Sequence, residues 1–478
     1  MSTKEGEVNE AASNEMQHEY SNALRNKATK KLISLAVIIL VAAAMAFFSA
    51  AGGRAQDGDG FQLQDHKLKG FDAQIAANIE QMMEDGKNVF RNDTFGDESF
   101  WGDLLQLHKA IEGARFGGVG SGVDPKTALS VGLKVDADAL PKSVLKDIRK
   151  GNVNLDDPAT TLALLKLDSV VGVKGFFNQD GSLKSIGITC ALCHSTVDDS
   201  LAPGIGSRLD GWPNRDLNVG AIVALSPNLK PVADLLGVNE GTLRTVLNSW
   251  GPGKFDAEVF LDGKAFRPDG KPAATLIPAA FGLAGVNLHT YTGWGSVTNW
   301  NAFVATLEMH GKGTYYDTRL NDAEKFPIAA RNGFGNVRSN PDLVTPKLAA
   351  LHIYQLAIPA PKAPEGSFDS AAANRGEAVF NGKAQCATCH VPPLFTEPGF
   401  NMHKASEIGI DDFQAKRSPD EAYRTTPLRG LWAHQKGGFY HDGRFANLRE
   451  VVEHYNTFKN LGLTEQEKND LVEYLKSL

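Results

Sequence analysis

The sequence predicts a mostly α protein with two helical domains of the same plan, placed after an apolar N-terminal segment. Three observations predict this. The pattern Cys-x-x-Cys-His occurs twice, at 190–194 and 386–390, and the two copies use all four cysteines. A Gly-x-x-x-Phe pattern precedes each copy, at 86–90 and 376–380. A proline-rich stretch at 359–365, typical of an inter-domain linker, separates the two halves.

Each Cys-x-x-Cys-His pattern has the chemistry of a covalent attachment site for haem c. The two thiols add across the haem vinyl groups, and the histidine that follows ligates the iron. A zinc site needs four nearby ligands, and each segment offers three at most. A redox dithiol needs no adjacent histidine. The sequence therefore predicts two covalently bound haem c groups, attached through Cys190, Cys193, Cys386 and Cys389 and ligated by His194 and His390.

The composition is that of an ordinary globular protein. The chain has 478 residues, which is enough for two or more domains with separate cores. Hydrophobic residues make up 42% of it and charged residues 22%, and both shares are typical of soluble domains. The formal net charge of -7 argues against nucleic acid as a partner.

The N-terminus carries an export or membrane signal. Residues 1–31 are polar, end in a basic cluster and are predicted to form a cytoplasmic tail. Residues 32–53 lack charge, and Leu32–Ala51 is long enough to span a bilayer as a helix. This segment is either a transmembrane anchor or a cleaved signal sequence. Both interpretations place the rest of the chain on the periplasmic side of the bacterial inner membrane, where covalent haem attachment takes place.

The remaining chain divides into a tether and two predicted haem domains. Residues 54–85 read as a polar tether that leads into the start of a helix. The N-terminal haem domain is predicted at 86–358. After the linker, the C-terminal cytochrome c domain is predicted at 366–478.

The first haem domain is expected to contain a large insertion. Cys386 follows Phe380 by 6 residues, whereas Cys190 follows Phe90 by 100. About residues 95–185 therefore form the predicted insertion, with short amphipathic pieces inside it.

The last helix of the chain is predicted from its cap and its apolar face. Thr464 and Glu467 form a capping box. Leu471, Val472, Leu475 and Leu478 recur at helical spacing. In c-type cytochromes the terminal helix crosses the Gly-x-x-x-Phe helix, so we expect Tyr474 to meet that helix at 376–380.

The second half resembles the bacterial di-haem cytochrome c peroxidase and MauG-type superfamily. The resemblance covers most of 366–478. In the first half it is looser and rests on the Cys-x-x-Cys-His pattern, the Gly-x-x-x-Phe helix and the segment around Glu308. The residues that carry it in the second half are Cys386–His390, Arg424–Gly430, Phe439–Arg444 and Leu448–Tyr455.

The resemblance implies different roles for the two haems. His194 would be the proximal ligand of a reactive iron that meets peroxide, and His390 that of a six-coordinate iron that relays electrons. Glu308 would be the catalytic acid that moves a proton between the peroxide oxygens. Tyr455 aligns with the sixth ligand of the second iron. Three rivals for that position are His441, Met402 and His454.

Two further features of the superfamily concern this sequence: a calcium-binding loop that it matches and a distal segment that it lacks. Family members bind calcium between their domains, partly through a loop that matches Thr425–Pro427. The family's Trp-Asp-Gly-Arg segment and the distal glutamine after it are not present. Trp294 or Trp300 could serve as the aromatic bridge between the haems.

The predicted function is reduction of hydrogen peroxide at the N-terminal haem, with electrons relayed through the C-terminal haem. The electron donor would be a small cytochrome or cupredoxin. One alternative is a membrane-tethered electron-transfer cytochrome without substrate chemistry. The other is a di-haem oxygenase of the rubber-cleaving kind, which the large insertion keeps open.

Overall fold

The computed structural model describes residues 68–478. The predicted tail at 1–31, the apolar segment at 32–53 and most of the tether at 54–85 lie outside the described residues, so those predictions remain predictions. Within 68–478, no helix combines the length and the apolar composition that a membrane span requires.

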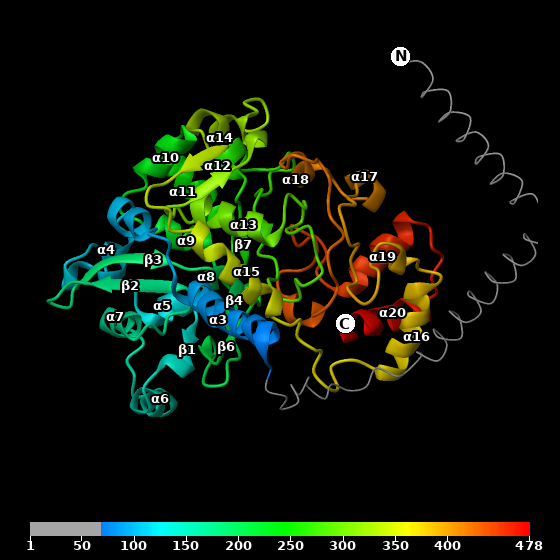
Figure 1. The fold of residues 1–478 in the computed structure, drawn as a ribbon, viewed down its shortest axis with the longest axis horizontal. Coiled ribbons are helices and arrows are strands. Elements are labelled where there is room, and N and C mark those ends of the chain that lie inside the picture. Colours follow the sequence, from blue (N-terminus) through cyan, green and yellow to red (C-terminus); the bar gives the residue numbers. More distant parts are fainter. Residues whose placement is uncertain (1–67) are drawn as a thin grey trace, which may run out of the picture. The chain divides into compact units, whose positions relative to one another are not determined.

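The described chain is mostly helical with small sheets, which confirms the predicted fold class at that level (Figure 1). The α-helices before the linker are α3 (Gly70–Asn92), α4 (Leu107–Glu112), α5 (Pro125–Ser130), α6 (Lys142–Arg149), α7 (Pro158–Lys166), α8 (Ala191–His194), α9 (Val219–Ala224), α10 (Lys230–Leu236), α11 (Glu240–Ser249), α12 (Val259–Asp262), α13 (Val297–Phe303), α14 (Pro327–Asn332) and α15 (Leu348–Ala357). Those after it are α16 (Ser370–Asn381), α17 (Ala405–Ile408), α18 (Phe413–Lys416), α19 (Leu448–Phe458) and α20 (Glu465–Ser477).

Short helical turns of other types connect these helices. The π-helical turns are η1 (Ser99–Leu104) and η4 (Val304–Glu308). The 3-10 turns are η2 (Ala114–Phe116), η3 (Ala137–Ala139), η5 (Thr318–Asn321), η6 (Thr345–Lys347), η7 (Cys386–Thr388) and η8 (Leu431–His434).

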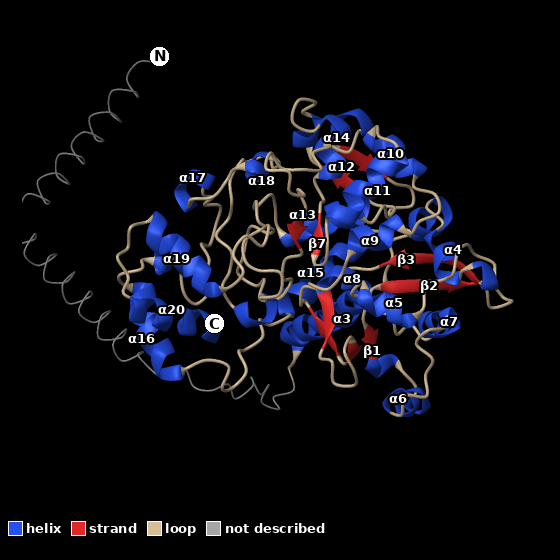
Figure 2. Cartoon of the chain, turned by 180° about the vertical axis from the view of Figure 1, so that it is seen from behind, coloured by secondary structure: helices blue, strands red, loops and turns tan. Residues whose placement is uncertain are grey.

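The strands are short and pair two by two, and within 68–478 all of them precede the linker (Figure 2). The β1·β5 pair is parallel, and β2·β3, β4·β6, β7·β8 and β9·β10 are antiparallel. Their bounds are β1 (Val135–Asp136), β2 (Val173–Phe177), β3 (Leu183–Ile188), β4 (Ser195–Val197), β5 (Ile205–Gly206), β6 (Arg208–Asp210), β7 (Lys254–Phe255), β8 (Thr275–Leu276), β9 (Thr314–Tyr316) and β10 (Asn336–Arg338).

The segment at 95–185 contains short helices and the β2·β3 hairpin. The hairpin turns at Asn178, whose backbone N–H donates to the Ser182 carbonyl at 2.9 Å. Leu165 and Leu183 of this segment share a hydrophobic cluster with Leu243 of α11. The segment is therefore packed onto the helices that follow the first attachment turn. The domain boundaries remain predictions, since residues 74–478 form one compact unit.

The first Gly-x-x-x-Phe helix, α3, is crossed by α15. A Cβ atom added at Gly86 would lie 2.1 Å from the Ala350 carbonyl oxygen, so only glycine permits this approach. The Phe90 ring, which is fully buried, lies 5.6 Å from the Tyr354 ring.

The second such helix, α16, is crossed by α20, as the sequence predicts. A Cβ atom added at Gly376 would lie 2.0 Å from the Asp470 carbonyl oxygen. The Phe380 and Tyr474 rings lie 5.2 Å apart in an edge-to-face contact. Arg375 pairs with the Asp470 carboxylate at 2.6 Å beside the crossing. The predicted contact between Tyr474 and the Gly376/Phe380 helix is confirmed.

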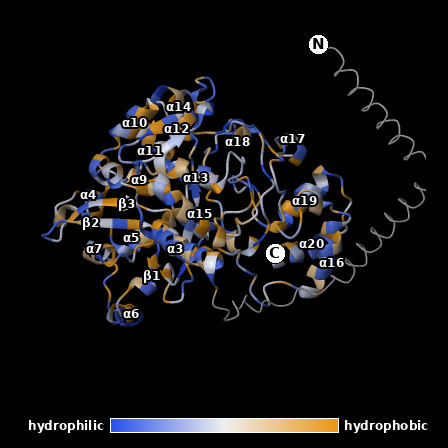
Figure 3. Cartoon of the chain, in the orientation of Figure 1, coloured by the Kyte–Doolittle hydropathy of each residue, from blue (hydrophilic) through white to orange (hydrophobic). Residues whose placement is uncertain are grey.

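The chain after the linker has a hydrophobic cluster of its own. Phe380, Leu431, Val452 and Leu471 belong to it. Helices α19 and α20 carry both hydrophobic and hydrophilic residues (Figure 3), and each buries one side in this cluster. The capping box predicted at Thr464 is present and begins α20.

We expect Gly376→Ala to lower the free energy of unfolding by about 1–3 kcal/mol, because the added methyl group meets a backbone carbonyl that cannot move aside alone. Chemical denaturation of the purified protein measures this. Gly241→Ala in the exposed part of α11 is the matched control, since its only close neighbour is the Asn239 side chain at 3.2 Å. Equal stability of the two variants would contradict the tight crossing.

Candidate functional site

The first Cys-x-x-Cys-His turn is held between β3 and β4. The backbone N–H of Ile188, at the end of β3, donates to the Asp97 carboxylate at 3.2 Å. After the turn, the Ser195 hydroxyl donates to Asp210 at 2.8 Å. Asp210 also accepts from Arg91 of α3 and from the Tyr354 hydroxyl of α15, each at 2.5 Å. The α3·α15 crossing therefore anchors this turn through one carboxylate.

The His194 side chain is poised to ligate a metal as a neutral imidazole. Burial lowers its pKa to about 4. Its Nδ1 is buried without a hydrogen-bond partner, and the nearby Pro278 backbone lacks the geometry of a hydrogen bond. A neutral ring at physiological pH keeps a lone pair for a metal.

The second turn fixes its histidine through a local hydrogen bond. The turn begins in η7, and His390 Nδ1 lies 3.1 Å from the Phe395 carbonyl oxygen. A carbonyl accepts only, so Nδ1 carries the proton and the lone pair of the neutral ring is on Nε2. Burial lowers the pKa of His390 as well.

The residues of both turns fit haem c. The four cysteines are free thiols rather than disulfides. Burial raises the pKa of Cys190 and of Cys193 to about 12, and that of Cys386 to about 11, so these thiols are protonated and lie in apolar surroundings. Each turn thus offers two thiols for thioether bonds and one neutral imidazole for the iron.

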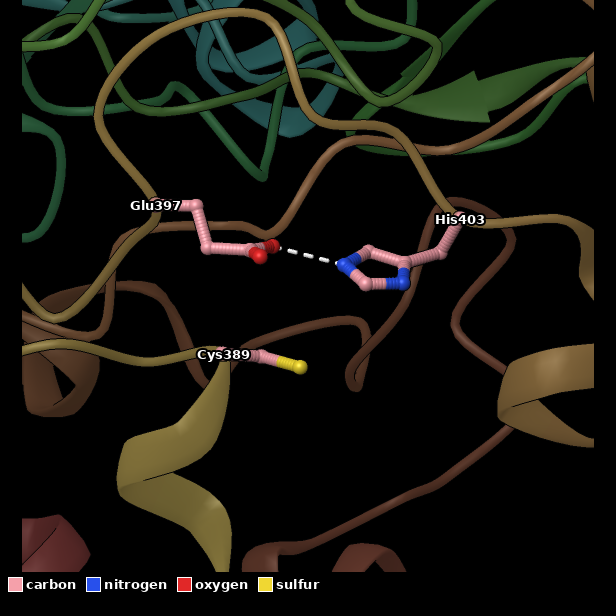
Figure 4. A group of neighbouring side chains, drawn as sticks. All are labelled: Cys389, Glu397 and His403. Atoms are coloured by element: carbon pink, nitrogen blue, oxygen red, sulfur yellow. Dashed lines mark hydrogen bonds and ion pairs between the residues drawn. The ribbon is translucent and has the colours of Figure 1, made fainter.

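A cluster of donors lies beside the second turn. Cys389 Sγ, a Glu397 carboxylate oxygen and a His403 ring nitrogen lie within 4.8 Å of one another (Figure 4). His403 Nε2 is 2.6 Å from Glu397, and its Nδ1 is 3.1 Å from Glu407. Burial opposes the charge on His403, but the two carboxylates outweigh it and raise its pKa. Because Cys389 is predicted to bond to haem, we interpret the group as an ion pair beside that haem.

Tyr455, the predicted sixth ligand of the second iron, lies on α19. Burial raises the pKa of its hydroxyl, and Cys386 and Cys389 act in the same direction. The Tyr440 ring lies 6.4 Å from it. The rival His454 uses Nε2 in a hydrogen bond to the Ile408 carbonyl at 2.8 Å.

The other two rivals lie elsewhere. His441 is buried and stacks on Tyr423 with ring centroids 5.2 Å apart. Met402 lies against Gly293, where an added Cβ would come within 2.6 Å of its sulfur. Neither rival forms a hydrogen bond or a ring contact with the Cys386–His390 turn in the described part of the chain, and all four assignments stay predictions.

Glu308 is buried with an unpaired carboxyl group. It is 8% exposed, and neither of its carboxylate oxygens has a hydrogen-bond partner. It ends the π-helical turn η4, a geometry that is frequent at functional sites. Ala305 and Met309, which flank Glu308, share a hydrophobic cluster with Ala191 and Cys190 of the first attachment turn. Glu308 is thus carried by a turn that packs against that site.

Burial raises the pKa of Glu308 well above its usual value, and the carboxylates of Glu258 and Asp256 add to the increase. Asp256 is itself fully buried, and burial raises its pKa to about 7. The cation of this region is Arg417, which pairs with Asp256 at 2.9 Å. The raised pKa favours the protonated form of Glu308, which a general acid needs.

The two tryptophans predicted as a bridge between the haems, Trp294 and Trp300, lie in a hydrophobic core cluster. Trp294 and Trp300 pack with Phe303 in a cluster that contains no residue after the linker, and Trp294 Nε1 donates to Asp317 at 3.0 Å. A different pair, Trp212 and Trp432, connects the two halves with ring centroids 5.1 Å apart. Sequence reasoning missed this contact because Trp212 lies in a Gly- and Pro-rich loop and Trp432 in the short 3-10 turn η8, neither of which has a recognisable periodicity.

Known proteins share parts of this sequence. The methylamine utilization protein MauG of Methylorubrum extorquens is 28% identical over 220 residues, which are 39% of this chain and 61% of that protein. The cytochrome-c peroxidase IdrP1 of Denitromonas iodatirespirans is 27% identical over 224 residues, which are 35% of this chain and 58% of that protein. No family model matches the chain.

These relatives support the resemblance of the chain to the di-haem cytochrome c peroxidase and MauG superfamily. The match spans about three fifths of each of these two relatives. The similarity supports haem c as the cofactor and di-haem oxidoreductase activity at the level of the superfamily.

Solved structures give weaker similarities. A MauG-like protein associated with microbial copper homeostasis is 20% identical with a TM-score of 0.28, over 46% of this chain and 79% of that one. The hydrazine synthase of Kuenenia stuttgartiensis is 20% identical with a TM-score of 0.25, over 45% of this chain and 76% of that one.

We expect Glu308→Gln to stabilise the fold increasingly as pH rises. The unfolded chain releases the Glu308 proton above about pH 4.5, while the folded chain retains it, so the wild-type free energy of unfolding falls as pH rises through this window. Glutamine removes that loss. Thermal unfolding at pH 5 and pH 8 measures the difference, and Glu84→Gln on the exposed side of α3 is the control. A pH-independent difference would mean that Glu308 is ionised in the folded protein.

Proposed function

We propose that this protein is a di-haem c-type oxidoreductase that reduces hydrogen peroxide at the N-terminal haem with electrons relayed through the C-terminal haem. The observation that carries the proposal is the buried, unpaired carboxyl of Glu308 on a turn that packs against the first attachment site. A site for electron transfer alone has no need of a buried protonated acid.

At the first site, Cys190 and Cys193 hold the cofactor and His194 ligates it. When bound, the haem supplies the redox chemistry for cleavage of the peroxide O–O bond. Reduction of peroxide to two water molecules consumes two electrons and two protons. Glu308 donates its proton to the leaving peroxide oxygen and then takes up the proton of the other oxygen, which assists heterolysis. Its apolar surroundings keep it protonated until that step.

At the second site, Cys386, Cys389 and His390 hold the relay haem. Tyr455 is the proposed sixth ligand, because it interacts with both cysteines and its rival His454 is engaged by a backbone carbonyl. A tyrosinate ligand stabilises ferric iron.

Trp212 and Trp432 are the proposed bridge between the two haems, in place of Trp294 or Trp300. Asn214, two residues after Trp212, donates its N–H to the Cys193 carbonyl at 2.8 Å. The edge-to-face contact of the two indoles joins this loop to η8 in the second half.

The remaining parts of the proposal follow from the predicted export signal and the family. The protein acts on the periplasmic side of the bacterial inner membrane, anchored by residues 32–53 or released after their cleavage. A small cytochrome or cupredoxin donates the electrons. Calcium binds near the loop at Thr425–Pro427.

Electron paramagnetic resonance of the isolated ferric protein tests the proposal. One high-spin haem that binds cyanide or peroxide supports it. Two low-spin haems that bind neither would leave an electron carrier. Oxygen consumption without peroxide would instead identify an oxygenase.

We expect Glu308→Gln to lower the rate of peroxide reduction by about two to four powers of ten, because glutamine cannot donate the proton. Steady-state turnover with a reduced donor measures this. His194→Ala should abolish the activity and leave the absorbance of the second haem intact. Unchanged turnover in Glu308→Gln, with Glu84→Gln as the control, would remove Glu308 from the mechanism.

We expect Trp432→Phe to slow electron transfer between the haems severalfold, because the indole that contacts Trp212 is lost. Stopped-flow re-reduction of the first haem after peroxide reports this rate. Trp300→Phe is the matched variant: a slower rate there, with Trp432→Phe unaffected, would restore the bridge to the cluster at 294–303.

A further inference from the structure

Two arginines of the described chain have no carboxylate partner to balance their charge. Arg215 is 7% exposed, its Nε is buried without a partner, and one Nη donates to the Lys436 carbonyl at 3.3 Å. The Arg424 guanidinium donates to the backbone carbonyls of Thr290 and, at 2.9 Å, Leu288. Neither arginine forms an ion pair with a carboxylate of residues 68–478.

Other buried arginines of the described chain do have such partners. Arg417 pairs with Asp256 at 2.9 Å and with Asp262 at 2.8 Å. Arg208 pairs with Asp136 at 3.0 Å. Burying an unpaired cation is costly, so the two arginines without partners point to an anion that the chain does not supply.

Tyr291 interacts with both guanidinium groups but does not balance them. Burial raises the pKa of its hydroxyl above the usual value, so the group stays neutral. Burial lowers the pKa of Arg424 to about 10, which leaves its guanidinium charged at neutral pH. Two positive charges and one neutral hydroxyl therefore face one another.

Each arginine is tied to one attachment turn. Arg215 directly follows Asn214, whose N–H donates to the Cys193 carbonyl at 2.8 Å. Arg424 directly precedes Thr425, whose hydroxyl donates to Glu397.

Glu397 belongs to the second attachment site. Figure 4 shows it beside Cys389, with its carboxylate directed at His403. The chain at Arg215 thus adjoins the first turn, and the chain at Arg424 adjoins a residue that binds Glu397 beside the second.

We infer that Arg215 and Arg424, with Tyr291 between them, form a carboxylate-binding site at the junction of the two attachment turns. The planar guanidinium fork matches a carboxylate with two parallel hydrogen bonds. The inference rests on the proposed haem attachment, because the propionate carboxylates of a bound haem are one source of this anion. A small free carboxylate is the other source.

The reduction potential of the haem-loaded protein tests the site. Removing a cation beside the haem favours the ferric form, so Arg215→Gln and Arg424→Gln should each shift the ferric–ferrous equilibrium about tenfold, or about 59 mV for one electron, toward ferric. Arg215→Lys and Arg424→Lys retain the charge and should shift it less. Arg331→Gln is the control, since Arg331 is exposed and contacts only the Leu235 carbonyl. Spectroelectrochemical titration measures each potential.

Two further measurements identify the source of the carboxylate. Shifted propionate bending bands in resonance Raman spectra of the variants identify haem propionates. A saturable response of the wild-type potential to formate, lost in the variants, identifies a free carboxylate.

Unchanged potentials and Raman bands in the variants, with no response to formate, would overturn the inference. If the glutamine variants do not fold, the lysine variants decide, because lysine keeps the charge but loses the fork. Their Raman bands or their formate response should then change, and wild-type behaviour in both would reject the site. A wild-type protein without haem in a pyridine haemochrome assay would instead refute the proposed function.

Discussion

The close crossing of a glycine-bearing helix by a tyrosine-bearing helix is the packing constraint on which both attachment turns depend. At Gly86 and at Gly376 the partner backbone occupies the space of a side chain, so neither crossing can shift without a clash. In the first half the crossing also positions the turn, because Arg91 and Tyr354, one from each helix, both bind Asp210. The location of the histidine that follows is therefore set by helix packing before any cofactor binds.

Burial of unbalanced charge distinguishes the functional region from the rest of the interior. Arg417 and its carboxylates show the usual solution, in which opposite charges are buried together. Glu308 lacks a partner and stays neutral by keeping its proton, whereas Arg215 and Arg424 cannot lose theirs. An unpaired acid can act as a proton donor, and unpaired guanidinium groups need an anion. Burial in the same low-dielectric interior therefore prepares Glu308 to donate a proton and prepares Arg215 and Arg424 to bind an anion.

Local sequence signals predicted the parts of the fold that local chemistry determines. The capping box at Thr464 and the contact of Tyr474 with the Gly376 helix are confirmed because spacing within a helix decides them. The partner of the Gly86 helix was not predicted, since Tyr354 lies far along the chain and α15 shows no matching pattern. The Trp212–Trp432 contact joins an irregular loop to the short 3-10 turn η8, and neither segment has a period that would predict a contact.

The two histidines show how the long first half changes the chemistry available to an otherwise similar turn. His390 finds its carbonyl acceptor at Phe395, within its own loop, so its orientation is fixed locally. His194 has no such local partner, and its surroundings come from distant segments that include the turn ending at Glu308. Two residues after that turn, His310 has a left-handed backbone with φ of 60° and stacks on Phe100 of η1. A site assembled from remote segments can bury a side chain such as Glu308 without giving it a hydrogen-bond partner. This assembly leaves an unpaired acid at the first site, and the compact second half provides only a fixed ligand.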